Sequence, residues 1–260
     1  MALAFPVYFE LGGFRLHPHA VLELAAYAAG FRLYLAARRR GGDVIDARTR
    51  WSVVAAAILG AGIGSRVLFW FESPALTAAR WTDVSYLLSG KTIVGALIGG
   101  LIAVEIVKHV MGVRRRTGDL FAVPLAVGIA IGRIGCFLAG LDDQTYGSPS
   151  QLPWAVDFGD GVTRHPVQLY ESAFAAVLAV WLWRENARPH REGSVFRHFM
   201  VAYMTWRVVV DALKPEPRVF VGLSSLQIAA LGVVIYYAIV AWRGIRRPDP
   251  EVAAAPGGVR

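Results

Sequence analysis

Apolar stretches long enough to cross a membrane recur along the chain, with short polar segments between them. Each is close to the 17 to 25 residues that a helix needs to cross the hydrocarbon of a bilayer. They cover residues 20–37, 51–71, 92–111, 119–140, 166–183, 197–213 and 224–242. The sixth, RHFMVAYMTWRVVVDAL, is the least apolar. The pattern predicts an all-α integral membrane protein, a bundle of seven transmembrane helices.

Two segments outside these stretches alternate apolar and polar residues instead. PVYFELGGFRLHPH has a Gly-Gly pair at its centre, and WAVDFGDGVTRHP has Asp160-Gly161 at its turn. Such turn residues between alternating segments are typical of β-hairpins. We expect two small hairpins that form a cap on the outer face of the bundle.

Composition agrees with a membrane protein. Of the 260 residues, 55% are hydrophobic and only 18% are charged, and the mean hydropathy is +0.46. A soluble domain of this length would carry more charge. No cleavable signal peptide is evident at the N-terminus. We expect one transmembrane domain over residues 1–247 and a flexible tail over residues 248–260.

The net charge of +8 comes from arginines that flank the apolar stretches, as in AARRRGGDVIDARTR, VRRRTG and RGIRRPDP. This position argues against a nucleic-acid partner and favours a role in membrane orientation. Basic residues gather in the loops after stretches one, three and five and after stretch seven, and the alternate loops are poorer in them. Because cytoplasmic loops carry the excess of arginine and lysine, the N-terminus should lie outside and the C-terminus inside.

Several charged or polar side chains fall inside the apolar stretches, where a charge costs at least about 2.5 kcal/mol. They should therefore face the interior of the bundle and pair. These residues are Glu23, Arg32, Arg66, Glu105, Lys108, Arg133, Gln168, Glu171, Arg207 and Asp211.

Arg133 and Arg207 are the strongest candidates for function. Arginine holds a phosphate through two parallel hydrogen bonds, so two of them in an outward-opening cavity would suit a phospholipid headgroup. The alternative is an internal salt bridge of Arg207 with Asp211 or Glu171. Arg66 has two similar alternatives: it binds the substrate, or it only pairs with Glu72 or anchors the helix.

Two motifs carry a resemblance to a known family. GRIGCFLAG, residues 132–140, is followed by RHPVQLYES, residues 164–172; WRVVVD and ILGAGIGSRVLFW add to them. Their order, spacing and placement resemble prolipoprotein diacylglyceryl transferase over about residues 6–243. The family has seven spans with the N-terminus outside, which agrees with the charge pattern.

The chain departs from the family pattern at specific positions. The histidine of the family's span-three signature is Val94, and the asparagine after its G-R-x-G run is Cys136. Leu141 replaces an acidic residue, although Asp142 and Asp143 follow. The chain is therefore a divergent member by this resemblance.

The resemblance implies transfer of a diacylglyceryl group from phosphatidylglycerol to the lipobox cysteine thiol of a prolipoprotein, which yields a thioether and glycerol phosphate. Arg133 and Arg207 would clamp the phosphate, and Glu171 would act with them. His165 is the general-base candidate by its chemistry, or else it only orients the turn at Pro166.

A wider set is expected to bind the substrate. His17, His19 and Glu23 at the start of the first stretch are alternative bases, and Gln168 shares a helical face with Glu171. Cys136 is expected to pack as a small apolar residue. The full substrate-binding set is Gly132, Gly135, Gln168, Tyr170, Asp211, Arg66, Gly95, Gly99, His17, His19 and Glu23.

The expected partners are phosphatidylglycerol, a prolipoprotein signal peptide with its lipobox cysteine, and the bacterial cytoplasmic membrane. No cofactor and no metal are expected, although Asp142 or Asp143 could hold a divalent ion. Two other functions stay open: a related transferase with a different acceptor, and a lipid-binding or transport protein. Against transport, no internal repeat is found and the polar residues gather toward the outer end.

Overall fold

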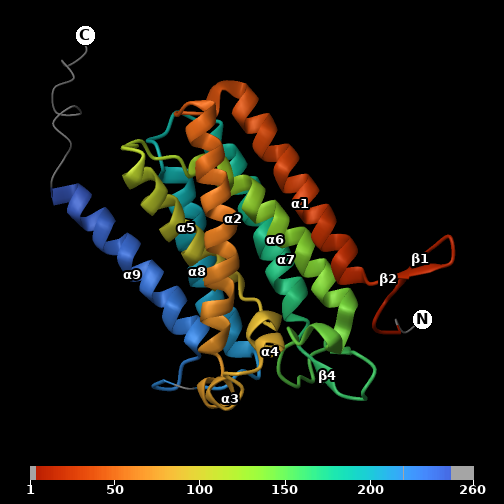
Figure 1. Cartoon of the computed structure of the whole chain (residues 1–260). Coiled ribbons are helices and arrows are strands. Elements are labelled where there is room, and N and C mark those ends of the chain that lie inside the picture. The colour runs from red at the N-terminus through yellow and green to blue at the C-terminus, as the bar shows by residue number, and fades with distance from the viewer. Residues whose placement is uncertain (1–3, 219, 247–260) are drawn as a thin grey trace, which may run out of the picture.

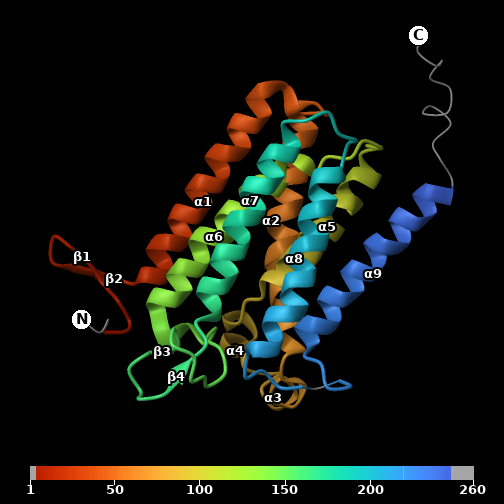
Figure 2. The ribbon, with the colours of Figure 1, turned by 180° about the vertical axis from the view of Figure 1, so that it is seen from behind.

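A computed structural model describes residues 4–218 and 220–246, without the side chains of residues 41–42 and 243–246. Its helices run roughly along one axis, as Figures 1 and 2 show from opposite sides. The predicted tail, residues 248–260, lies outside the described residues. The long helices are α1 (Pro18–Ala37), α2 (Ala47–Trp70), α5 (Ile93–Val110), α6 (Asp119–Ala139), α7 (Val167–Asn186), α8 (Ser194–Val210) and α9 (Ser225–Arg246).

Five of the described helices are long and apolar enough to cross a membrane: α1, α2, α5, α6 and α9. The other two long helices, α7 and α8, carry polar residues such as Gln168, Glu171 and Arg207 along their length. The helical prediction is therefore confirmed, and five candidate membrane spans stand in the structure.

Local signals in the sequence set where these helices begin and end. The Asp46 carboxylate accepts hydrogen bonds from the backbone N–H groups of Arg48 and Thr49 and so caps α2. Thr92 caps α5 in the same way through Gly95 N–H. Pro18 stands at the first position of α1, where its missing N–H has no cost. At Gly140 the positive φ of 63° ends α6.

Short elements gather at one end of the bundle (Figure 1). Both predicted hairpins are present, β1 (Phe9–Leu11) with β2 (Phe14–Leu16) and β3 (Val156–Asp157) with β4 (Thr163–Arg164). Two further helices, α3 (Pro74–Ala79) and α4 (Val84–Ser89), lie there too and were not predicted. With only six residues each, they are too short for a hydrophobic period to reveal.

Three short turns complete the described part of the bundle. A π-helical turn, η1 (Arg38–Gly42), leads from α1 to α2 at the end opposite the hairpins. Two 3₁₀ turns, η2 (Gly140–Asp143) and η3 (Asp211–Leu213), instead continue α6 and α8 at the end that bears the hairpins. Both of these turns contribute an acidic residue to the candidate site, Asp143 from η2 and Asp211 from η3.

The helices pair as α2 with α5, α1 with α6, α6 with α7 and α8 with α9. The core lies where α6, α7, α8 and α9 meet, and its largest side chains come from α8. They include Phe199, Met200, Tyr203 and Met204, all fully buried. Val94 is 1% exposed and belongs to this apolar core.

Candidate active site

Two guanidinium groups meet at one carboxylate inside the bundle. Arg133 from α6 and Arg207 from α8 both lie 2.9 Å from Glu171 Oε2 of α7, Arg133 through Nε and Arg207 through Nη1. The other oxygen, Oε1, accepts a hydrogen bond of 2.5 Å from Tyr203 Oη. Glu171 is 1% exposed and the two arginines 6% and 3%. The residues predicted to converge therefore do so, with Glu171 between them.

The ion-pair network continues into η3. Arg207 Nη2 donates to Asp211 Oδ1 at 2.7 Å, and Lys214 Nζ lies 3.7 Å from the same oxygen. The buried charged residues of the network are thus three cations and two carboxylates: Arg133, Arg207, Lys214, Glu171 and Asp211. Glu216, whose side chain is 26% exposed, pairs with Lys214 from the edge. The salt-bridge alternative for Arg207 is thus present in the structure together with the convergence of the two arginines.

Unused hydrogen-bonding atoms remain beside this network. The buried Gln168 side chain makes no hydrogen bond through either polar atom to the described residues, and neither do Nε of Arg133, Nε of Arg207 and Oδ2 of Asp211. The contact of Arg133 Nε with Glu171 is therefore a charge contact without hydrogen-bond alignment. Buried polar groups normally have partners, so these atoms keep hydrogen-bonding capacity that the described residues do not use.

A second cluster adjoins Arg133 at Cys136. Arg133 Nη1 lies 3.8 Å from Cys136 Sγ, which in turn lies 3.8 Å from His19 Nδ1. His19 Nδ1 is 2.8 Å from Asp143 Oδ1 of η2. The three ligand-type atoms of His19, Cys136 and Asp143 all lie within 4.8 Å of one another. Cys136 is buried as predicted, but its neighbours are charged.

His19 is also tied to Glu23 one turn along α1, with Nε2 and Oε2 3.5 Å apart. The other oxygen of Glu23 accepts a hydrogen bond from Tyr27 Oη at 2.7 Å and lies 3.8 Å from Lys91 Nζ. His19 and Glu23, which the sequence placed at the outer end as alternative bases, therefore lie in one cluster with Cys136 and Asp143.

The other histidines lie apart from these clusters. His165 Nδ1 is 3.4 Å from Tyr170 Oη, and that hydroxyl accepts from Trp154 Nε1 at 2.7 Å. These contacts fit the orienting alternative for His165, and the base assignment stays a prediction. His17 packs its ring edge against Tyr8, 5.8 Å between centroids.

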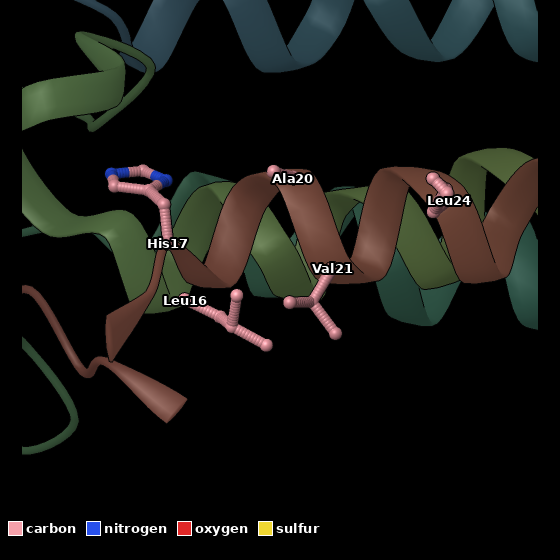
Figure 3. A pocket seen from close by; sticks show the side chains of 5 residues that line it. All are labelled: Leu16, His17, Ala20, Val21 and Leu24. Atoms are coloured by element: carbon pink, nitrogen blue, oxygen red, sulfur yellow. The ribbon is translucent and has the colours of Figure 1, made fainter. Parts of the chain in front are cut away.

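The hollow in Figure 3 holds none of the ion-pair residues. It is a shallow apolar hollow of about 360 Å³ at the start of α1. His17 stands at its edge, beside the side chains of Leu16, Ala20, Val21 and Leu24. His17 is the one lining residue with a polar side chain, and the rest of the lining is apolar.

The predicted glycines divide into two groups. A Cβ on Gly95 or Gly99 would lie 2.3 Å from a backbone oxygen of α2, so both sit in the contact between α2 and α5. Gly135 faces α1, where a Cβ would lie 3.0 Å from Leu22 Cβ. Gly132 differs, because a Cβ there would meet nothing within 4 Å. Open space thus adjoins the helix one residue before Arg133.

Arg66 donates from Nη1 to the Gly62 carbonyl of its own helix, at 3.0 Å. The alternative partner, Glu72, instead faces the charges around Lys214 and Glu216. Substrate binding by Arg66 stays a prediction.

Tyr203 and Lys214 belong to the network and were not predicted from the sequence. Tyr203 stands four residues before Arg207, on the same face of α8, so helical spacing was a signal that could have found it. Lys214 follows the helix in an irregular segment, where spacing carries no such information.

Comparison with known proteins identifies the family of this chain. Residues 6–243 match the sequence model of prolipoprotein diacylglyceryl transferase. The chain belongs to this family.

Individual members resemble the chain over most of its length. A phosphatidylglycerol–prolipoprotein diacylglyceryl transferase of Bordetella parapertussis is 31% identical over 85% of this chain and 86% of its own. One of Clostridium tetani is 31% identical over 88% of this chain and 94% of its own. One of Cupriavidus metallidurans reaches 33% identity over 62% of this chain. The matched range includes GRIGCFLAG and HPVQLYES, which hold Arg133 and Glu171, two of the charged residues of the buried network.

Proposed function

We propose that this diacylglyceryl transferase moves the diacylglyceryl group of phosphatidylglycerol to the thiol of a prolipoprotein's lipobox cysteine. The donor and acceptor classes come from the names of its relatives. One observation assigns the proposal to particular residues. The guanidinium groups of Arg133 and Arg207 meet at Glu171 Oε2, and the Nε atom of each makes no hydrogen bond to the described residues.

The enzyme sits in the bacterial cytoplasmic membrane with seven spans, its N-terminus outside. The five apolar helices support this placement, and α7 and α8 lie among them with charges turned to each other. The hairpins, α3 and α4 lie at one end, and the arginine-rich turn of Arg38–Gly42 lies at the other. This distribution fits the excess of basic residues in cytoplasmic loops.

Arg133 and Arg207 bind the lipid phosphate and stabilise the leaving group. The substrate sulfur attacks the glyceryl carbon that bears the phosphate oxygen, so an S–C bond forms and the C–O bond breaks. The electron pair leaves with glycerol phosphate, whose phosphate gains a negative charge. Donors fixed in place before the reaction stabilise that charge without reorganisation.

Glu171 acts as the positioning residue of this clamp. Its carboxylate holds the two arginines in one place, and Tyr203 fixes its other oxygen. Lys214 adds a further cation to the network through Asp211, and the buried Gln168 adds an amide with no hydrogen-bond partner among the described residues. The space beside Gly132 gives room for the lipid next to Arg133.

The test replaces each arginine by lysine, which keeps the charge and removes the planar pair of donors. The Arg133→Lys and Arg207→Lys enzymes, inserted in nanodiscs that contain labelled phosphatidylglycerol, receive a lipobox peptide. We expect each turnover rate to fall about 10²–10³-fold, the usual effect of one lost transition-state donor. Arg115→Lys is the control, since Arg115 pairs with Glu192 on the exposed surface.

Wild-type rates in both lysine variants would contradict the clamp. The same assay separates a second candidate, a related transferase with a different acceptor, which the apolar surroundings of Val94 favour. Label in a product other than the lipobox peptide would identify that reaction.

A further inference from the structure

We propose that His19, Cys136 and Asp143 form a zinc site that binds and activates the acceptor thiol; this role for the metal rests on the proposed function. The ligand atoms are Nδ1, Sγ and a carboxylate oxygen, all within 4.8 Å of one another. Mixed nitrogen, sulfur and oxygen ligands suit zinc, and three protein ligands with an open fourth position are typical of its catalytic sites.

One of the two ligand-atom distances known for this cluster is that of a tetrahedral zinc site, and the other is shorter. Zinc bonds of about 2.0–2.3 Å place the ligand atoms of a tetrahedral site about 3.3–3.8 Å apart. Cys136 Sγ and His19 Nδ1 are 3.8 Å apart. His19 Nδ1 and Asp143 Oδ1, at 2.8 Å, would have to separate by roughly half an ångström on metal binding.

The outer partners also fit a metal site. A histidine that binds a metal through one nitrogen usually donates from the other to a carboxylate. Here Nε2 of His19 faces Glu23 Oε2, at 3.5 Å. Asp143 is held likewise, since Thr145 Oγ1 donates to its second oxygen, Oδ2, at 2.6 Å. Both ligands thus present one atom to the cluster and have the other fixed.

The charges balance around such an ion. A thiolate from Cys136 and the Asp143 carboxylate neutralise Zn²⁺, and an added substrate thiolate leaves one negative charge. Arg133 Nη1 lies 3.8 Å from Cys136 Sγ, where it offsets that charge, while its own charge is shared with Glu171. Arg133 therefore faces the thiolate side of the site and links it to the phosphate clamp.

The cluster is open to a substrate. The His19 side chain is 32% exposed and that of Asp143 13%, while Cys136 is buried behind them. The acceptor thiol would take the fourth position of the zinc, where it loses its proton, because a thiol that coordinates zinc is deprotonated outright. The proton passes to water, which can reach the cluster because the His19 side chain is 32% exposed. Zinc would thus supply a thiolate beside Arg133, and that sulfur would attack the glyceryl carbon as its C–O bond to the phosphate breaks.

The first test is metal binding by the full chain in nanodiscs. Elemental analysis of the purified protein and of chelator-stripped protein reloaded with zinc should give a single metal ion per chain. Reloading with Co²⁺ should give a thiolate-to-cobalt charge-transfer band and the visible bands of tetrahedral cobalt. Cys136→Asn should lose the charge-transfer band, and His19→Ala and Asp143→Asn should not retain the metal.

Two further variants keep the test independent of folding. Glu23→Gln should bind zinc about 10–100-fold more weakly, the usual effect of losing an outer partner. Asp142→Asn, next in sequence to Asp143 but exposed, should bind as the wild type does. Equal binding by wild type, Cys136→Asn and Asp143→Asn would overturn the site, and so would a wild-type chain that takes up neither zinc nor cobalt.

The transfer assay separates this proposal from the proposed function. Stripped enzyme should lose thioether formation and regain it with zinc. Full turnover after complete removal of the metal would overturn its role in thiol activation. Zinc binding with no diacylglyceryl transfer in any preparation would overturn the proposed function and leave the metal site standing.

Discussion

Glu171 is the residue on which the buried charges depend. One of its oxygens serves Arg133 and Arg207 and the other serves Tyr203. Because its side chain is 1% exposed, water cannot take over these contacts if the carboxylate is lost. Two buried cations would then lose the counter-charge that they share.

We therefore expect Glu171→Gln to destabilise the protein by about 3–5 kcal/mol, the usual cost of breaking a buried ion pair. Reversible unfolding in mixed micelles measures this difference. The matched control is Glu192→Gln, which breaks the exposed pair with Arg115 and should cost less than about 1 kcal/mol. A small loss in both variants would mean that water reaches the network and that burial does not govern its strength.

At the scale of elements, α2 and α5 approach each other through small residues. Gly60 and Gly64 on α2 face Gly95 and Gly99 on α5, backbone against backbone. Membrane helices associate through such small residues because lipid supplies no hydrophobic drive between them. This contact holds α5 against α2. At the start of α5, the backbone N–H of Thr92 also donates a hydrogen bond to Ser65 Oγ of α2, at 2.9 Å.

Two glycines of α2 provide a matched pair for testing this contact. A Cβ on Gly64 would lie 2.4 Å from the Gly95 carbonyl oxygen, whereas a Cβ on Gly62 would meet nothing within 4 Å. We expect Gly64→Ala to lower the unfolding temperature. Gly62→Ala should leave it unchanged or raise stability by up to about 1 kcal/mol, since alanine is the better helix former. Equal effects in thermal unfolding would contradict this packing.

At the scale of the whole molecule, segments distant in sequence bring their charges together at the end that bears the hairpins. Glu72 follows α2, while Lys214 and Glu216 follow α8. Burial and the charge of Glu216 raise the pKa of Glu72 to about 7, against the pull of Lys214 and Arg207, and Asp211 adds to the rise. Burial and the nearby arginines lower the pKa of Lys214. This end of the molecule therefore changes charge near neutral pH.

The direction of the effect on stability follows from linkage. The pKa of Glu72 is higher in the folded than in the unfolded state. Its contribution to the stability of the fold is therefore fully present below pH 4.5 and is lost as the pH rises through about 7. We expect Glu72→Gln to remove this loss, so that the variant gains unfolding temperature over the wild type from pH 5 to pH 8. Arg164 lowers the pKa of Asp160 to about 2. Asp160→Asn should therefore leave the slope over this range unchanged, and an equally steep slope in Glu72→Gln would exclude Glu72 as its source.

The sequence by itself determined the long helices, both hairpins and the family. Hydrophobic length, capping residues and turn glycines are local signals, so they can be read without knowing which helices touch. It also singled out Arg133, Arg207, Glu171 and Asp211, because a charge inside an apolar stretch is conspicuous wherever its partner lies.

Only the tertiary structure decided how those charges pair. That Arg133 and Arg207 share one oxygen of Glu171 depends on the packing of α6, α7 and α8, which spacing along one helix cannot give. The meeting of His19 with Cys136 and Asp143 depends likewise on α1 lying against α6. Cys136 looked like a packing residue because a small buried side chain gains its chemistry from its neighbours, and those neighbours come from distant parts of the chain.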